Sequence, residues 1–206
     1  EKRNRNIRVI GNPIREIKQD RQISKENIVL TVSRLIRTKH LDQLIRLFVR
    51  MNQAGWRLVI VGGDAQRQNL MAELQQLVHQ LGAEDRVVLT GNQSDVDRYY
   101  QKSKIFAFTS SSEGFPNVVG EALSAGLPVV SFDCVAGPSD MIRDGENDFL
   151  VPVFDYITFE NKLTYLMVND NLRKEMSKYA VHNIKNYSRE NIGEKYFQFI
   201  IDKITC

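Results

Sequence analysis

The residues best suited to chemistry are two carboxylates and two cations. Glu113 and Glu121 stand 8 positions apart, and Arg34 and Lys39 stand 5 positions apart in an earlier loop. A carboxylate can accept hydrogen bonds from two hydroxyls, whereas Arg and Lys bind phosphate. These residue types together fit a ligand that carries both hydroxyls and phosphate. On spacing alone, both glutamates could equally be solvated surface residues, and a solvated basic loop is the simpler interpretation of the two cations.

The two glutamates belong to a strand–loop–helix–strand unit. The apolar run Ile105–Thr109 predicts a strand, and the small residues that follow it, up to Gly114, predict a loop. A helix is expected to begin at Phe115-Pro116, because proline suits the first helical position, and to end at Gly126. A helix start carries unpaired N–H groups and a partial positive charge, and it therefore attracts phosphate. Gly114 would let such a ligand approach the backbone.

The wider pattern predicts a parallel sheet. Continuous apolar runs alternate with amphipathic helices, which is typical of strands buried on both faces. We therefore expect an α/β, Rossmann-like three-layer domain with a mostly parallel sheet of about six strands. Loops after parallel strands meet at one edge, where ligands bind. The candidate positions just beyond the strands are Arg34, Gly62, Gly91, Glu113 and Asp133.

Composition and missing motifs exclude several classes of function. The chain has 206 residues and a net charge of +3, too mild for nucleic acid as the main partner. Two cysteines form no disulfide framework, and no apolar run approaches the length of a membrane span. The three histidines are scattered and no Asp-x-Asp pair is present, so neither a metal site nor a metal-chelated diphosphate is expected. The Gly-rich dinucleotide fingerprint and a Ser–His–Asp set are also missing.

The amino-terminal residues suggest a link to something longer. Ile7–Ile10 reads as a short strand or linker ended by Gly11-Asn12-Pro13, and the charged stretch 15–27 reads as a surface excursion. The chain begins at Glu1 without a methionine, and we expect it to be a segment cut from a longer protein.

The stretch EGFPNVVGEALSAGLPVV resembles the E-x7-E signature of the retaining, nucleotide-sugar-dependent glycosyltransferases of family 4 (glycosyl transferases group 1). The loop Arg34–Lys39 is similar to that family's basic motif, although His40 stands where glycine is usual. The resemblance runs from Val9 to the last helix. It implies that the chain is the carboxy-terminal, donor-binding half of a two-domain GT-B architecture.

The resemblance also implies a role for each candidate residue. Glu113 would hold hydroxyls of the donor sugar near the reacting carbon, and Glu121 would hold the ribose diol. Arg34 and Lys39 would stabilise the leaving diphosphate. The remaining implied donor-binding positions are Gly62, Gly91, Asn92, Gly114, Phe115, Pro116, Asn117 and Val118.

The family implies a division of the chain into three parts. Residues 1–14 would form an interdomain linker with a short leading strand, 15–187 the donor-binding domain, and 188–206 a terminal helix facing an absent amino-terminal domain. That domain would bind most of the acceptor, and the isolated segment would bind nucleotide but turn over little.

The implied reaction is hexosyl or N-acetylhexosaminyl transfer, with retention, from a nucleotide-diphosphate sugar to a glycan or lipid-linked acceptor. UDP is the expected nucleotide, and no metal or other cofactor is expected. The implied setting is polysaccharide assembly in the cytoplasm, at the inner face of the plasma membrane. Two alternatives stay open: a non-catalytic sugar-nucleotide-binding module, and a GT-B-like epimerase or phosphorylase.

Overall fold

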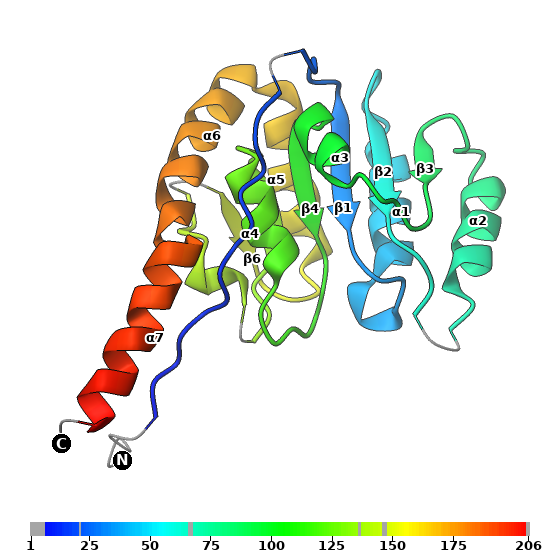
Figure 1. The fold of residues 1–206 in the computed structure, drawn as a ribbon. Helices are drawn as coiled ribbons and strands as arrows, with labels where there is room; N and C mark the ends of the chain where they lie inside the picture. The colour runs from blue at the N-terminus through cyan, green and yellow to red at the C-terminus, as the bar shows by residue number, and fades with distance from the viewer. Residues whose placement is uncertain (1–6, 21, 66–67, 136, 146–147, 205–206) are drawn as a thin grey trace.

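The computed structural model describes residues 7–20, 22–65, 68–135, 137–145 and 148–204. Its centre is a six-stranded sheet in the order β3-β2-β1-β4-β5-β6, in which every neighbouring pair is parallel (Figure 1). The expected Rossmann-like sheet is therefore confirmed. The strands are β1 (Ile28–Val32), β2 (Arg57–Val61), β3 (Val87–Leu89), β4 (Ile105–Phe108), β5 (Val129–Phe132) and β6 (Phe149–Val151).

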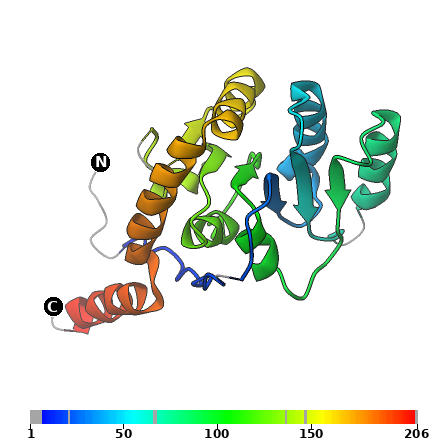
Figure 2. The same cartoon turned by 90° about the horizontal axis from the view of Figure 1, so that it is seen from above.

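Helices cover both faces of this sheet, as Figure 2 shows from above. One face packs against α1, α2 and α5, and the other packs against α3, α4 and the carboxyl-terminal half of α6. The helices are α1 (Leu41–Met51), α2 (Leu70–Gln80), α3 (Asp97–Lys102), α4 (Asn117–Ser124), α5 (Tyr156–Val168), α6 (Asp170–Ile184) and α7 (Arg189–Ile204). Short 3-10 turns lie at Arg37–Lys39, Pro138–Asp140 and Lys185–Tyr187.

Alternation along the strands builds the two halves of the core. Successive side chains of a strand point to opposite faces, and Val29 and Leu30 of β1 accordingly enter different hydrophobic clusters. Both side chains are fully buried. A nearly continuous apolar strand, such as β1 with Thr31 as its one polar residue, is thus what a sheet covered on both faces requires.

Side chains fix the starts of the two long helices that follow the sheet. Asp155 accepts a hydrogen bond from the Thr158 amide at the start of α5, and Asn169 does the same for the Leu172 amide at α6. Each caps an amide that has no partner inside its helix, an interaction worth about 1 kcal/mol.

The segment ahead of β1 packs against the domain, although most described residues of the expected surface excursion 15–27 are exposed. Residues 7–20, called here the leading segment, form no strand, yet Ile14 and Ile17 are buried. The segment runs along α4 (Figure 1), where the Ile17 amide donates to Ser124 Oγ at 2.9 Å and Ile14 lies against Gly120. Two apolar side chains within a charged stretch show no periodicity, so no sequence pattern marked them as buried.

We expect Gly120→Ala to destabilise the fold by about 1–2 kcal/mol. Alanine in a helix normally gains about 0.5–1 kcal/mol over glycine. Here the new Cβ would lie 2.5 Å from Ile14 Cδ1 and 2.6 Å from Cγ1, and overpacking of a core costs about 1–3 kcal/mol. Urea unfolding of both proteins measures the difference.

The matched background is Ile14→Ala, which removes the atoms that clash. In that background the same Gly120→Ala change should become stabilising, because only the helix preference remains. An equal loss of stability in both backgrounds would show that the leading segment does not press on α4.

A buried carboxyl group lies at the opposite edge of the sheet, where the strands begin. Asp148 is fully buried; its Oδ1 accepts the Val129 amide, and its Oδ2 has no hydrogen-bond partner within the described residues. Burial raises the pKa of Asp148 well above its ordinary value. The folded protein therefore holds this proton more tightly than the unfolded chain does.

Asp148 should make the fold less stable as pH rises. Its contribution to the free energy of unfolding is fully present below pH 4, which is about the pKa of Asp in the unfolded chain. As pH rises from there to the raised pKa of the folded state, this contribution falls by at most about 1.4 kcal/mol per pH unit. Asp148→Asn should remove this slope, as urea unfolding at a series of pH values would show. Hydrogen bonds from Thr158 lower the pKa of Asp155, so the contribution of Asp155 to stability should increase as pH rises. An unchanged slope in Asp148→Asn would contradict the assignment.

The terminal helix α7 projects beyond the body of the domain (Figure 1). Ile192 near its start is buried, whereas Tyr196, Phe197 and Ile200 are exposed. Within the described residues, no helix combines the length and the hydropathy needed to span a bilayer.

Candidate functional site

The loops that carry the candidate residues lie at one edge of the molecule. All paired strands are parallel, so the loops after β1, β2, β3, β4 and β5 leave the sheet at its carboxyl end. From β1 the chain builds outward to β3 and then returns to β4, which makes the β1/β4 boundary the switch point of the sheet. Ligands of open α/β sheets bind in the crevice outside such a boundary.

Hydrogen bonds join the two loops that flank this boundary. The Ser111 amide donates to the Thr38 carbonyl at 2.9 Å, and Thr109 Oγ1 donates to the Lys39 carbonyl at 2.7 Å. His40 Nε2 lies 2.8 Å from Ser111 Oγ. The backbone around Lys39 is thus fixed to the loop that carries Glu113.

His40 closes this loop in a left-handed conformation. Its φ of 50° and ψ of 40° belong to the region that glycine enters at least cost, which explains why glycine suits this position of the motif. Its ring also contacts Phe154 edge-on at a centroid distance of 5.1 Å. The contacts to Ser111 and Phe154 hold the histidine in a conformation that would otherwise be unfavourable.

Lys39 and Glu113 form an ion pair across the boundary. Their side chains are only 12% and 14% exposed, so water screens them less than an ordinary surface pair. The Lys39 ammonium also lies 5.5 Å from the ring centroid of Phe108. The structure thus brings together a cation and a carboxylate that are 74 positions apart in the chain.

The loops after β1, β2 and β3 form a second connected group. The Gly62 amide donates to the Gly91 carbonyl at 3.0 Å, and the Asn92 side chain covers Gly63. Gly62, with φ +139°, passes directly beneath the Ser33 carbonyl. Arg34 follows Ser33 and is exposed at this edge. The structure therefore gathers Arg34, the glycines and Asn92 at the carboxyl ends of β1, β2 and β3.

The start of α4 differs slightly from the expectation. Pro116 is the residue before the helix, and Asn117 is its first residue. The Asn117 amide donates to the Phe115 carbonyl at 3.0 Å, and the Val119 amide to the Pro116 carbonyl at 2.9 Å, so neither amide is free. Gly114 is exposed, and Val118 is half-buried in the first turn.

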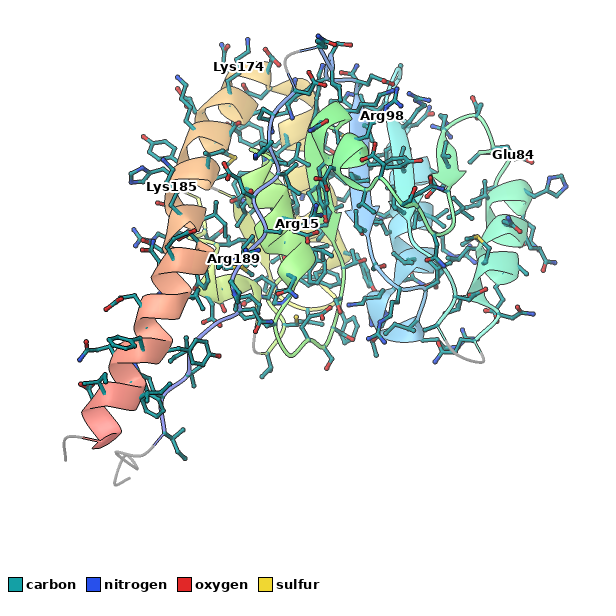
Figure 3. All side chains as sticks on the ribbon, viewed as in Figure 1. Arg15, Glu84, Arg98, Lys174, Lys185 and Arg189 are labelled. Carbon is teal, nitrogen blue, oxygen red and sulfur yellow. The ribbon has the colours of Figure 1, made fainter. Side chains whose placement is uncertain are left out.

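Glu121 lies apart from the Lys39–Glu113 pair, on the side of α4 that meets α3 and the leading segment. Its Oε2 accepts from Tyr100 Oη at 3.0 Å and its Oε1 from Arg15 Nε at 3.4 Å. Burial, and then the charge of Glu121, raises the pKa of Tyr100 well above its usual value, and the phenol stays a donor. Arg15, labelled in Figure 3, also pairs with Asp97.

Sequence reasoning missed Arg15 and Asn12, whose Nδ2 donates to Asn117 Oδ1 at 3.2 Å. Both belong to the leading segment; Asn12 lies in the Gly11-Asn12-Pro13 turn noted in the sequence, and no motif distinguishes Arg15.

A cysteine lies near the pair. Cys134 is only 2% exposed, and burial together with the nearby Glu113 carboxylate raises the pKa of its thiol. Throughout the described part of the chain, no group of three or more His, Cys, Asp or Glu side chains is placed to hold a metal ion.

Two cavities lie away from the Lys39–Glu113 pair, although the first reaches the loop after β1 at Ile36, Arg37 and His40. One, of about 520 Å³, lies between α1 and α2, and another, of about 610 Å³, lies between the leading segment and helices α6 and α7. Neither is lined by Lys39 or Glu113. The candidate site is an open edge of one domain.

Comparison with known proteins shows that this chain is similar to glycosyltransferases. Residues 13–182 match the family model described as "Glycosyl transferases group 1". The chain is 31% identical over 172 residues to the amylovoran biosynthesis glycosyltransferase AmsD of Erwinia amylovora, covering 84% of this chain and 47% of that protein. It is also 28% identical to an undecaprenol-diphosphate-glycan alpha-1,4-N-acetyl-D-galactosaminyltransferase of Campylobacter jejuni, covering 95% of this chain and 55% of that protein.

A solved structure shows the same fold. A point mutant of S. aureus TarM, in complex with Fondaparinux, alpha-GlcNAc-glycerol and UDP, superposes with a TM-score of 0.84 at 28% identity. The match covers 94% of this chain and 39% of that one. This chain spans about half the length of the two curated relatives. The match to the family model spans most of the chain, and the protein therefore belongs to the glycosyl transferases group 1 family.

Proposed function

We propose that this chain is the donor-binding half of a retaining glycosyltransferase of family 4, which transfers a hexosyl or N-acetylhexosaminyl group from a UDP-sugar. The observation that carries the proposal is the position of Lys39 and Glu113. They meet at the β1/β4 switch point, Arg34 is exposed in the same loop as Lys39, and α4 begins four residues after Glu113. The solved TarM complex, which shares this fold at 28% identity, contains UDP.

The leaving group in this reaction is the nucleoside diphosphate. Arg34 and Lys39 neutralise its developing charge, and the amide of Gly114 together with the positive end of α4 adds to this field. Because Asn117 and Val119 use their amides within the chain, the backbone contribution comes from fewer groups than the motif implied. No metal ion is required when two cations bind the diphosphate.

Glu113 and Glu121 bind the hydroxyl groups at the two ends of the donor. Glu113 orients hydroxyls of the transferred sugar, and Glu121 accepts from the ribose diol while Tyr100 and Arg15 fix its carboxylate. Retention needs no covalent nucleophile if the acceptor attacks on the face that the diphosphate leaves.

The acceptor is a glycan or a lipid-linked glycan, bound mainly by a domain that precedes this chain. The acceptor named for the C. jejuni relative, a glycan on diphospho-undecaprenol, supports this class of acceptor. The corresponding site of action is the cytoplasmic face of the membrane.

Calorimetric titration with UDP, GDP and ADP tests the proposal. UDP should bind most tightly, and Glu121→Ala should weaken UDP by about 10-fold or more, as expected for a lost charged hydrogen bond. Glu160→Ala is the matched control, since Glu160 pairs with Arg50 on the surface. A protein that binds none of the three nucleotides would contradict the proposal.

A further inference from the structure

The Lys39–Glu113 pair joins two residues that the proposed function gives to different parts of the donor. Lys39 is to bind the diphosphate, and Glu113 is to bind the hydroxyls of the transferred sugar. In the structure they bind each other, with both side chains largely enclosed. The Lys39 Nζ–H and the Glu113 Oε1 that form the pair are not available to the donor while the pair is intact.

We propose that donor binding is an exchange of partners at this pair: the diphosphate takes Lys39, and the sugar hydroxyls take Glu113. The inference rests on the proposed function and adds a preference to it, for the intact donor over the nucleotide that the reaction releases.

The loops confine the exchange to the side chains. Two hydrogen bonds fix the backbone of Lys39. Its amide donates to the Ile36 carbonyl at 3.0 Å, and its carbonyl accepts from Thr109 Oγ1 at 2.7 Å. The backbone of Ser111, two residues before Glu113, is fixed to Thr38. Rotation of two side chains therefore suffices to separate the pair.

The preference follows from what each ligand leaves unpaired. A bare nucleoside diphosphate takes Lys39 and leaves the enclosed Glu113 carboxylate without a partner, next to a second anion. Losing one partner of an enclosed pair is unfavourable because the remaining charge is uncompensated. A sugar nucleotide supplies hydroxyls that donate to Glu113 and remove this cost. The site thus favours the substrate and assists release of the nucleotide product.

The exchange predicts an unusual effect of removing a binding residue. Glu113→Gln removes the negative charge that holds Lys39, so the variant should bind UDP about 3- to 10-fold more tightly than the wild type. Of the UDP-sugars tested, the wild type will bind one most tightly. The variant should have a lower affinity than the wild type for that UDP-sugar. If Glu113 contacted only the sugar, its replacement would leave the affinity for UDP unchanged.

A double-mutant cycle separates the exchange from the general effect of removing a negative charge. In the Lys39→Met background no lysine remains to be freed, so Glu113→Gln should give a gain of less than about 2-fold. Glu73→Gln is the matched control, since it removes an equal negative charge from α2, where Glu73 pairs with Arg37 of the loop after β1. It should leave the affinity for UDP unchanged.

The binding measurements use this chain with UDP and a panel that includes UDP-glucose and UDP-N-acetylglucosamine. Tighter UDP binding by Glu113→Gln, absent in the Lys39→Met background, supports the exchange. A gain of equal size in both backgrounds, or no gain in either, overturns it and leaves nucleotide binding intact. A wild-type chain that binds no UDP would instead contradict the proposed function itself.

Discussion

Arg34→Ala is expected to lower kcat/KM for glycosyl transfer by about 100- to 1,000-fold, the usual effect of losing one preorganised group that stabilises developing charge. Arg34 lies exposed beside the β1/β4 boundary, and Lys39 at the same boundary is engaged with Glu113 in the structure. Arg34 is thus the cation available to the diphosphate from the start. Initial rates of the complete protein over a range of donor concentrations give kcat and KM separately.

Arg37→Ala is the matched control for this result. Arg37 belongs to the same loop, but its guanidinium pairs with Glu73 on α2, at 3.1 Å. Its replacement should change kcat/KM by less than about 2-fold, since exposed pairs contribute little. Arg34→Lys should fall between the two, because it keeps the charge and loses the planar fork that binds phosphate bidentately. Equal losses in Arg34→Ala and Arg37→Ala would show that the loop's net charge, and not Arg34, is what matters.

Gly62→Ala should destabilise the fold by more than about 3 kcal/mol, the largest single effect on stability that we expect. A Cβ at Gly62 would lie 1.8 Å from the Ser33 carbonyl oxygen, a backbone atom that cannot rotate away. The φ of +139° is unfavourable for any side chain in addition. Urea unfolding measures the loss. Because Ser33 adjoins Arg34, the folded fraction should also bind UDP more weakly.

Gly91→Ala separates the clash from the backbone strain. Gly91 has φ +70°, and a Cβ added there would meet no atom within 4 Å, so only the left-handed conformation is penalised. Its replacement should cost about 1–2 kcal/mol. If Gly62→Ala lost no more stability than Gly91→Ala, the Ser33 carbonyl would not lie as close to Gly62 as the structure places it.

The sequence determined the sheet and the edge at which the candidate residues lie. Apolar runs such as Ile105–Phe108 have no polar side to expose, so they must be buried on both faces, and alternation with helices makes their pairing parallel. Once the strands are parallel, residues that follow them, such as Arg34, Gly62 and Glu113, must share one edge. This part of the prediction needed only local patterns and a rule of chain handedness.

Only the tertiary structure decided which of these residues meet. No local pattern could show that Ile14 packs on Gly120 or that Arg15 reaches Glu121, because these contacts join segments about 106 positions apart. The pairing of Lys39 with Glu113 depends in the same way on β1 lying next to β4. Periodicity records which face of an element is buried, whereas the choice of partner depends on how the sheet orders its strands. The types of residue at this edge were therefore predictable from the sequence, whereas the pairing of Lys39 with Glu113 was not.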